Sequence, residues 1–589
     1  MKIKISDYIA KFLVEKKMFT IFGITGGGAM HLNDSLSKTK KLEFIFFHHE
    51  QSASMAAEAF FRKKQTPCVL HTTSGPGGVN ALTGVSGAWI DSIPIFVISG
   101  QVQKCDMINN TKTRQIGVQE INIIDLVKPI TKYAKVIKNP NLIDLYLNES
   151  YEKMLEGKPG PVWLDVPLDI QSKFIDIKKI KKNSINFSLI EKNIQKSKRP
   201  IIIIGNGLHI SKSEKEFSKL NKIFKIPIIS SWNASDIIKS SDKFYSGRMG
   251  IFGDRASNFA VENSDLIIAL GTRLSIPQTG YKTKLFAHNA KKIIVDIDKY
   301  ELNKNKFSKV IKKINIDLKI FFQKALKHFK NKKIKKFNKW VDLINYWKKK
   351  YPVMQNKYLS EKKYINSFHF IDCLSSHLKG NETIVTDMGT SFTCTMQTFN
   401  IKNPIKQRLF TSSGLASMGF GLPGAIGAFF ANKKKPIICI TGDGGMMFNI
   451  QELQTILNYK IPMKVFVIEN QGYLTMKLMQ IKNFNRYVGS TKSSGISFPS
   501  LKEVSTTFKL KYFKLKKHNM KSQILNIMNY KKSALVEVNM PPQQPLIPRT
   551  QNRLKEDGSF ITPRLDDLYP HLSEEELENQ RKKAKMLNE

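Results

Sequence analysis

The stretch TGDGGMMFNIQELQTILNYKIPMKVFVIENQGY, residues 441–473, begins at the end of one apolar run, PIICI, and contains a second, MKVFVIE. Between the two runs, MMFNIQELQTILN has the apolar spacing of a helix. A strand, a helix and a strand in this order indicate two parallel strands, whose carboxyl ends lie at the same edge of a sheet. Asp443 follows the first strand and Asn470 ends the second, so we expect the two side chains to lie side by side.

The same alternation of strand-length apolar runs and helix-like stretches recurs along the chain. The runs fall in three groups: EFIFF, PCVLHTT and IPIFVIS; PIIIIGNG, LIIALG and KIIVDID; and ETIVTD, PIICITGDG, MKVFVIEN and ALVEVN. This pattern is typical of parallel sheets covered by helices on both faces, and 589 residues are too many for one core. The sequence predicts an α/β protein with three doubly wound parallel-sheet domains, residues 1–175, 190–330 and 364–545, and a C-terminal extension, 546–589.

The charge of the chain is strongly positive, with a formal net charge of +46. Such a charge often indicates nucleic-acid binding, but here the excess is mostly lysine and is spread over the whole chain. We therefore predict a solvated lysine surface with some attraction for anionic substrates, and no nucleic-acid partner.

Neither a membrane span nor a zinc site is indicated. The sequence has no uncharged apolar run of 18 residues, and its first segment, MKIKISDYIAKFLVEKK, is charged throughout. The five cysteines are scattered without the paired spacing of zinc ligands. We expect a soluble, cytoplasmic protein with no membrane partner.

Glycines surround Asp443 in the opening stretch. Gly442, Gly444 and Gly445 would let the backbone approach a phosphate group at the start of the next helix. A carboxylate beside a diphosphate requires a hard cation between the two, and Mg²⁺ takes oxygen ligands such as the Asp443 carboxylate and the Asn470 amide. The stretch therefore predicts a diphosphate site bridged by a metal ion.

The first domain offers a second candidate site. Glu50 follows the strand-like run EFIFFHH and opens a helix of small residues, so it is either a buried proton donor and acceptor or an ordinary acid favoured by the helix dipole. The turn Ser74, Gly75, Pro76 and Gly77 follows the run PCVLHTT and would be a generic turn by itself. The residues alone leave both interpretations of Glu50 open.

Taken together, these motifs resemble those of the thiamine diphosphate enzymes. Across nearly its whole length, the chain resembles the acetolactate (acetohydroxyacid) synthase large subunit. The matching segments, in the family's order, are HHEQSA, SGPGGVN, SIPIFVISGQV, RQIGVQEINI, GKPGPVWLDVP, ALGTRLS, VDID, SSGLASMGFGLP and GDGGMMFNIQEL. The resemblance implies an enzyme that binds thiamine diphosphate and Mg²⁺, decarboxylates pyruvate and joins the remaining fragment to a second 2-oxoacid, with the cofactor as electron sink.

The resemblance also implies roles for individual residues. Glu50 activates the cofactor through its pyrimidine ring, Gln119 lies near the reacting centre, and Met418 lies beneath the cofactor and bends it. Asp443 and Asn470 bind Mg²⁺ together with a backbone carbonyl two residues later. The further cofactor-binding residues implied are Ser74, Gly75, Pro76, Gly77, Gly389, Thr390, Gly442, Gly444, Gly445 and Gly472, the last supplying that carbonyl.

The order of the domains implies a shared active site. Glu50 belongs to the first domain and Asp443 to the third, and in this family such sites are completed across a dimer. The resemblance thus implies a homodimer or homotetramer with active sites between subunits, and it leaves a regulatory subunit undecided. The alternative of a cofactor-free binding protein would be expected to have lost Glu50, Asp443 or Asn470, and all three are present.

FAD binding is open at this stage. The related synthases bind FAD in the middle domain, and Gly205, Gly207, Arg273, Asp298 and Asp317 fall at flavin-binding positions. However, a GNG after a strand is also an ordinary turn, and acids at strand ends are also ordinary caps.

The departures from the family fall near the acceptor pocket. Pro277 stands where the family has an arginine, Met479 where it has a tryptophan, and Val118 where it has a phenylalanine. Two hypotheses follow: a true acetolactate synthase of branched-chain amino acid biosynthesis, or a related carboligase or lyase. The second would use a different acceptor, as in modified-sugar pathways, or would simply decarboxylate a 2-oxoacid.

Overall fold

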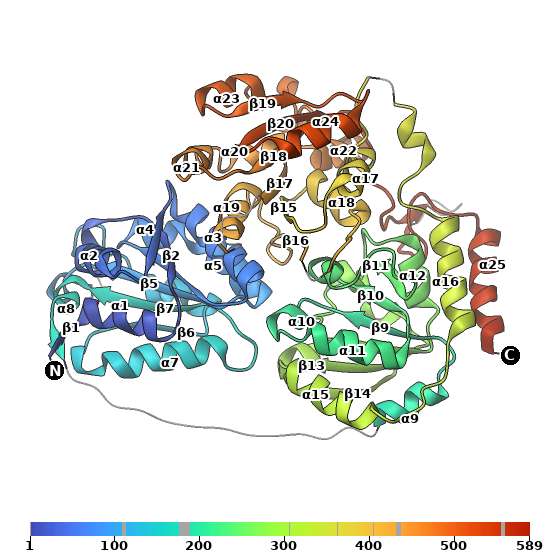
Figure 1. Ribbon diagram of the computed structural model, residues 1–589, viewed down its shortest axis with the longest axis horizontal. Helices are drawn as coiled ribbons and strands as arrows, with labels where there is room; N and C mark the ends of the chain where they lie inside the picture. Colours follow the sequence, from blue (N-terminus) through green and yellow to red (C-terminus); the bar gives the residue numbers. More distant parts are fainter. Residues whose placement is uncertain are drawn as a thin grey trace.

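In a computed structural model, the chain folds into three six-stranded parallel sheets, each flanked by helices (Figure 1). This confirms the predicted fold class. The structure describes residues 2–108, 114–175, 189–304, 307–361, 363–404, 406–431, 437–554 and 560–588. Residues 176–188, which follow the first domain and are rich in lysine, lie outside the described residues.

The N-terminal sheet has the strand order β3-β2-β4-β5-β7-β6. Its strands are β2 (Thr20–Gly23), β3 (Glu43–Phe46), β4 (Cys68–Thr72), β5 (Ile95–Gln101), β6 (Tyr133–Val136) and β7 (Val162–Pro167). Its main helices are α1 (Ile5–Glu15), α2 (Met30–Lys38), α3 (Glu50–Lys64), α4 (Pro76–Asn80), α5 (Leu82–Asp91), α6 (Ile123–Val127) and α7 (Ile143–Leu155). Every residue of β4, β5 and β7 is buried, which explains why these runs are continuously apolar rather than alternating.

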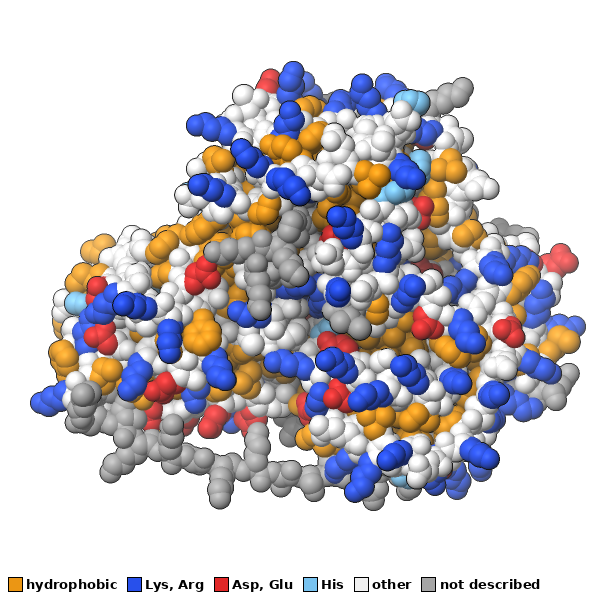
Figure 2. Space-filling view, viewed as in Figure 1, with side chains coloured by type: hydrophobic (Ala, Val, Ile, Leu, Met, Phe, Trp, Pro, Cys, Tyr) orange, Lys and Arg blue, Asp and Glu red, His pale blue; other side chains and the backbone are white. Residues whose placement is uncertain are grey.

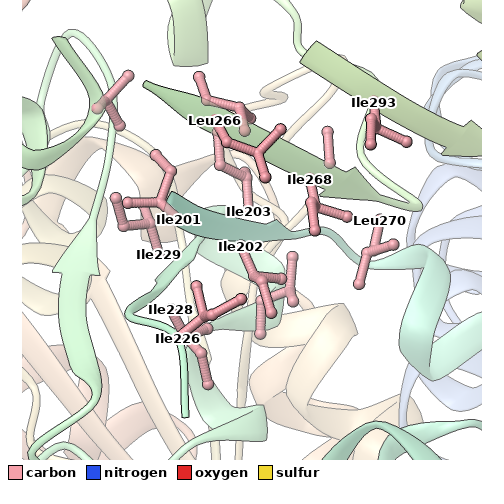
Figure 3. Close-up of a cluster of buried hydrophobic side chains, with 14 of the residues drawn as sticks. Ile201, Ile202, Ile203, Ile226, Ile228, Ile229, Leu266, Ile268, Leu270 and Ile293 are labelled. Carbon is pink, nitrogen blue, oxygen red and sulfur yellow. The ribbon is translucent and has the colours of Figure 1, made fainter. Parts of the chain in front are cut away.

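The central sheet has the order β11-β10-β9-β12-β13-β14. Its strands are β9 (Pro200–Ile204), β10 (Ile228–Ser230), β11 (Tyr245–Arg248), β12 (Leu266–Leu270), β13 (Lys291–Asp296) and β14 (Val310–Asn315), and its longer helices are α11 (Glu214–Phe224), α12 (Arg255–Glu262) and α15 (Leu318–Phe329). Isoleucines of β9 and β10 fill its core together with leucines and isoleucines of β12 and β13 (Figure 3). Burying each of these side chains contributes about 1.5–3 kcal/mol to the free energy of folding.

Two helices distant in sequence cover one side of the central domain. These are α16 (Asn338–Lys350) and α25 (Glu574–Lys585), which lie side by side at the right of Figure 1. Trp347 on α16 is fully buried and donates its indole N–H to Gln580 on α25 at 3.0 Å. The last part of the chain therefore returns from the third domain to pack on the second.

The C-terminal sheet has the order β16-β15-β17-β18-β20-β19. Its strands are β15 (Thr383–Thr386), β16 (Arg408–Phe410), β17 (Ile437–Gly442), β18 (Lys464–Glu469), β19 (Lys511–Lys514) and β20 (Ala534–Asn539). Its helices are α17 (Ser367–His377), α18 (Thr390–Thr398), α19 (Gly421–Ala431), α20 (Asp443–Met447), α21 (Glu452–Asn458), α22 (Leu474–Phe484), α23 (Leu501–Thr507) and α24 (Met520–Asn529).

Helix α3 of the first domain packs on α19 of the third within one continuous apolar cluster. The contact requires a glycine, because a Cβ at Gly427 would lie 2.1 Å from the carbonyl oxygen of Ala56. Beside this contact, Arg62 of α3 pairs within the first domain with Glu58 at 2.6 Å and Asp91 at 2.5 Å, and Asp91 in turn accepts backbone N–H groups of Ser413 and Gly414 from the third domain. The N-terminal and C-terminal domains of one chain are thus fixed to each other.

A second buried ionic contact joins the C-terminal and central domains. Arg408, on β16, forms an ion pair with Asp236 and donates a further hydrogen bond to the carbonyl of Arg62 at 2.9 Å. Asp236 is fully buried and also pairs with His209 at 2.8 Å. Burial alone would raise the pKa of Asp236, but Arg408 and His209 hold it at about 2.

The lysine excess is distributed over the surface. On the face shown in Figure 2, basic side chains are scattered over all three domains and mixed with acidic and uncharged ones. Within the described residues, every helix is too short or too polar to cross a membrane.

We predict that Arg408→Met lowers the stability of the fold by about 3–5 kcal/mol, because it leaves the buried Asp236 carboxylate without its main cation. Since the pKa of folded Asp236 lies below the ordinary value of 3.8, this stabilisation is present above about pH 4 and is lost as the pH falls toward 2. Thermal melting at pH 7 and at pH 3 measures both effects. Arg486→Met, at an exposed arginine of the same domain, is the control; a variant as stable as this control would contradict the assignment.

Candidate active site

Asp443 lies at the junction of β17 and α20, beside the end of β18. The two strands pair in parallel with Gly442 opposite Ile468, so Asn470 follows directly at the same edge. The Asp443 Oδ2 atom accepts backbone N–H groups of Asn470 at 3.1 Å and Gly472 at 3.3 Å, and Oδ1 accepts the N–H of Gly444 at 2.8 Å. The structure thus brings together the acid and the amide that the sequence placed at two strand ends.

The oxygen atoms of this pair fit a hard cation. Asn470 is 3% exposed, and its Oδ1 atom has no hydrogen-bond partner in the described structure, which is costly for a buried oxygen unless a ligand occupies it. Burial raises the pKa of Asp443, against the effect of the three N–H donors. Among the described residues, no group of three or more His, Cys, Asp or Glu side chains could hold a metal ion by itself, so a cation here would need oxygens from a ligand, as Mg²⁺ does when it binds a diphosphate.

Two of the glycines at this edge are sterically required. A Cβ at Gly444 would lie 2.3 Å from the ring of Tyr473, and one at Gly445 would lie 2.8 Å from Oδ2 of Asp387. Gly442 has no such close neighbour, since its nearest atom would be 3.9 Å away. The backbone after β17 is therefore open to a ligand on one side and closely packed on the other.

Asp387, at the end of β15, fixes the segment that carries Met418. Its Oδ1 atom accepts the backbone N–H of Gly419 at 3.0 Å, and its Oδ2 atom accepts the hydroxyl of Thr441 at 2.9 Å. Met418, next to Gly419, is 36% exposed. Gly389 and Thr390 follow Asp387 at the start of α18, and Gly389 has a φ of +81°, a conformation that favours glycine.

The N-terminal domain forms the second half-site around Glu50. Glu50 is the first residue of α3, is 8% exposed, and accepts a hydrogen bond from the Asn80 amide at 3.0 Å. A Cβ at Gly77 would lie 3.0 Å from its Oε1 atom, so the predicted turn after β4 does reach Glu50. A Cβ at Gly75 would lie 2.2 Å from the carbonyl oxygen of Gln119, which places Gln119 against the same turn.

Gln119 lies in a segment organised by its neighbour Glu120. The Glu120 carboxylate accepts backbone N–H groups of Ile116 at 3.0 Å and Gly117 at 3.1 Å. Gln119 itself is exposed, with a φ of +60°, and Val118 is 87% exposed. Gln119 therefore lies against the predicted turn, and no hydrogen bond joins its side chain to Glu50 in the described chain.

The two half-sites of one chain lie in different domains, Glu50 in the first and Asp443 in the third. Among the described residues, no hydrogen bond or ion pair joins Glu50 to Asp443. Neither residue lines the cavity at the strand ends of the central domain. Apolar side chains near the half-sites face solvent, including Val118 at 87%, Phe448 at 50% and Met418 at 36%. Exposed apolar groups that lie together are typical of ligand-binding or interaction surfaces.

This cavity, of about 520 Å³, lies at the carboxyl ends of the central strands. Four of the five predicted flavin positions line it: Gly205, Gly207, Arg273 and Asp317. Asp298 does not line it directly, but pairs at 3.3 Å with Lys158, which does. The carboxylate that lines the cavity from β13 is Asp296, which the sequence analysis missed. Burial raises the pKa of Asp296 to about 6.

Sequence reasoning also missed several residues that position the candidate site: Asn80, Glu120, Asp387 and Lys477. Asp387 had a usable signal, because it directly follows the strand-like run ETIVT, as Asp443 follows PIICI. Asn80 lies inside the quoted motif SGPGGVN, but its partner is 30 residues away. Lys477 is one lysine of 94 basic residues, and only its place on α22 distinguishes it.

Comparison with known proteins assigns the same three domains. The chain matches the thiamine pyrophosphate enzymes in the N-terminal thiamine pyrophosphate binding domain over residues 3–122, the central domain over 189–324 and the C-terminal thiamine pyrophosphate binding domain over 387–538. The fold and the candidate site therefore define a thiamine pyrophosphate (thiamine diphosphate) enzyme.

Individual relatives are more specific. The chain is 33% identical to the acetolactate synthase large subunit of Cyanidium caldarium, over 82% of this chain and 84% of the relative. It is 33% identical to the probable acetolactate synthase large subunit of Methanocaldococcus jannaschii, over 79% and 80%, and 28% identical to acetolactate synthase 2, chloroplastic, of Nicotiana tabacum, over 92% and 83%. The chain belongs to the acetolactate synthase large-subunit family of thiamine pyrophosphate enzymes.

We predict that Asp443→Ala weakens binding of thiamine diphosphate with Mg²⁺ by more than about 100-fold, because groups that only orient a metal ligand already contribute 10- to 100-fold. Isothermal titration calorimetry measures the affinity. Glu503→Ala, at an exposed acid of the same domain, is the control and should bind as the wild type does. Unchanged affinity in the Asp443 variant would remove Asp443 from the site.

Proposed function

We propose that this enzyme decarboxylates pyruvate and joins the remaining two-carbon fragment to a second carbonyl compound, as acetolactate synthase does. The observation that carries the proposal is the buried Asp443–Asn470 pair with its unpartnered amide oxygen, in a chain whose relatives are named acetolactate synthase large subunits. The first candidate acceptor is a second 2-oxoacid.

Each residue of the two half-sites has a distinct role in this proposal. Asp443, Asn470 and the carbonyl of Gly472 would bind Mg²⁺, and Met418 would support the cofactor from below. Glu50 would form a hydrogen bond with the pyrimidine ring and exchange a proton there. Its burial and its contacts with Asn80 and Gly77 hold it in place for this role. When bound, thiamine diphosphate supplies a nucleophilic carbon and an electron sink for decarboxylation.

We further propose that two copies of the chain complete each active site. Support comes from the location of Glu50 and Asp443 in different domains, from the absence of a direct bond between them in the described chain, and from the exposed apolar residues Val118, Met418 and Phe448. A homodimer with two-fold symmetry would place the Glu50 half of one chain against the Asp443 half of the other.

FAD is the proposed ligand of the central cavity. Support comes from its volume of about 520 Å³ and its lining by Gly205, Gly207, Arg273 and Asp317 at the strand ends, where dinucleotides bind in open α/β sheets. A Cβ at Gly205 would lie 2.2 Å from the carbonyl of Gly271, so this strand end tolerates no side chain. Arg273 also contacts Asp91 of the first domain at 3.4 Å.

A second candidate function keeps the cofactor chemistry and changes the acceptor. The observation that favours it is the placement of the three departures from the family. Pro277, which lines the central cavity, stands in place of an arginine, while Met479 and Val118 are 51% and 87% exposed. Without the basic and aromatic groups of the synthases, the site is less suited to a 2-oxoacid acceptor and would accept another carbonyl compound or only a proton.

We predict that the protein, incubated with pyruvate, thiamine diphosphate and Mg²⁺ with and without FAD, forms acetolactate at about one turnover per second or faster. Proton NMR follows pyruvate loss and identifies the product. Glu50→Gln should abolish turnover while thiamine diphosphate still binds. Acetaldehyde as the product, or no reaction until another carbonyl compound is added, would support the second candidate function instead, and normal turnover of Glu50→Gln would contradict the role of Glu50.

A further inference from the structure

A buried lysine lies directly beside the candidate metal site. Lys477, in the first turns of α22 (Leu474–Phe484), is 3% exposed, and its Nζ atom donates a hydrogen bond to the backbone carbonyl of Asn470 at 2.7 Å. Asn470 is the residue whose amide oxygen has no partner. The lysine therefore holds the main chain of a residue whose side chain points to the proposed cation.

The aliphatic part of Lys477 packs across the same loop. A Cβ at Gly472 would lie 3.5 Å from Cδ of Lys477 and 2.0 Å from the carbonyl oxygen of Ser490, and Gly472 has a φ of +138°. The N–H groups of Asn470 and Gly472 both bind Asp443. The position of Lys477 is thus linked to all three proposed metal ligands.

The ammonium group of Lys477 is not saturated by the protein. It has three N–H groups, of which one is bound by the carbonyl of Asn470, and none of the ion pairs among the described residues includes it. Other buried lysines of this chain are accommodated differently. Lys292 donates to the three carbonyls of Ala287, Ala290 and Ser308, and Lys464 combines the carbonyl of Lys532 with the ring of Tyr530.

A buried cation with unused donors is costly unless an anion accompanies it. The carboxylate nearest along this edge, Asp443, is already bound by three backbone N–H groups and is the proposed Mg²⁺ ligand. A diphosphate bound through Mg²⁺ would bring further negative charge to the same place, where a second cation stabilises it more strongly than it would in water.

We propose that Lys477 is a diphosphate-binding residue: it holds the Asn470–Gly472 loop in place and supplies a positive charge to the diphosphate that binds there with Mg²⁺. This inference rests on the proposed function, because it requires that the site bind a diphosphate. It adds one side chain to the site beyond those that the sequence motifs identify.

The test compares three variants of the full chain that separate the hydrogen bond from the charge. Lys477→Met keeps the length of the side chain and removes both, Lys477→Gln keeps an N–H donor without charge, and Lys477→Arg keeps both. Lys482→Met, at an exposed lysine of the same helix, is the matched control. Titration calorimetry with Mg²⁺ measures the affinity for thiamine diphosphate and, separately, for inorganic diphosphate.

We expect Lys477→Met to lose about 10- to 100-fold in affinity for both probes, the range of a charge-assisted hydrogen bond. Lys477→Arg should stay within a few-fold of the wild type, and Lys477→Gln should fall between, with a weaker dependence of affinity on salt than the wild type. We expect Lys477→Gln to melt at the temperature of the wild type, which would show that its lower affinity does not come from unfolding.

Two results are distinguishable failures. If the wild type binds thiamine diphosphate and Lys477→Met and Lys477→Gln bind it equally well, Lys477 has no role in the site, and the proposed function is unaffected. If the wild type itself does not bind thiamine diphosphate with Mg²⁺, the proposed function fails, and the inference about Lys477 fails with it.

Discussion

The parallel pairing of β17 with β18, with Gly442 opposite Ile468, is the constraint on which the site depends. It fixes the distance between the residue that follows one strand and the residue that ends the next. Asp443 can then bind the backbone N–H groups of Asn470 and Gly472. A register shift of one residue would turn the side chains of β18 to the opposite face and would move Asn470 and Gly472 away from the carboxylate that binds their N–H groups.

The rest of the molecule holds this edge relative to the other half-site. Ser52, two residues after Glu50, donates a hydrogen bond to Asn449 at 2.8 Å, and Asn449 in turn donates to the carbonyl of Gly419 at 2.8 Å. The backbone N–H groups of Ser413 and Gly414 bind Asp91 of the first domain at 3.1 and 3.2 Å. The start of α3 and the Met418 segment are therefore linked through buried polar groups, which are stable only when every donor and acceptor is satisfied.

The sequence was sufficient for the fold class, because parallel strands buried on both faces appear as continuous apolar runs and the runs PIIIIG and LIIALG leave little alternative. It was also sufficient to bring Asp443 beside Asn470, because strand ends of one sheet share an edge. It could not reveal the return of α25 to the central domain, since the hydrogen bond between Trp347 and Gln580 has no local signal. The sequence also could not distinguish Asp296, which lines the cavity, from Asp298, which was predicted to do so. The two acids are two residues apart at a strand end, and the conformation of the turn decides which one lines the cavity.

The central claim is that Glu50 of one chain and Asp443 of another serve one cofactor. Mixing the Glu50→Gln and Asp443→Ala proteins under conditions that exchange subunits tests it directly, with exchange verified by native mass spectrometry. A site shared between chains predicts that the mixture recovers about a quarter of wild-type turnover, because half of randomly assorted dimers are mixed and each holds one intact site. A mixture no more active than the separate variants, despite exchange, would show that each chain uses its own Glu50 and Asp443 and would contradict the account.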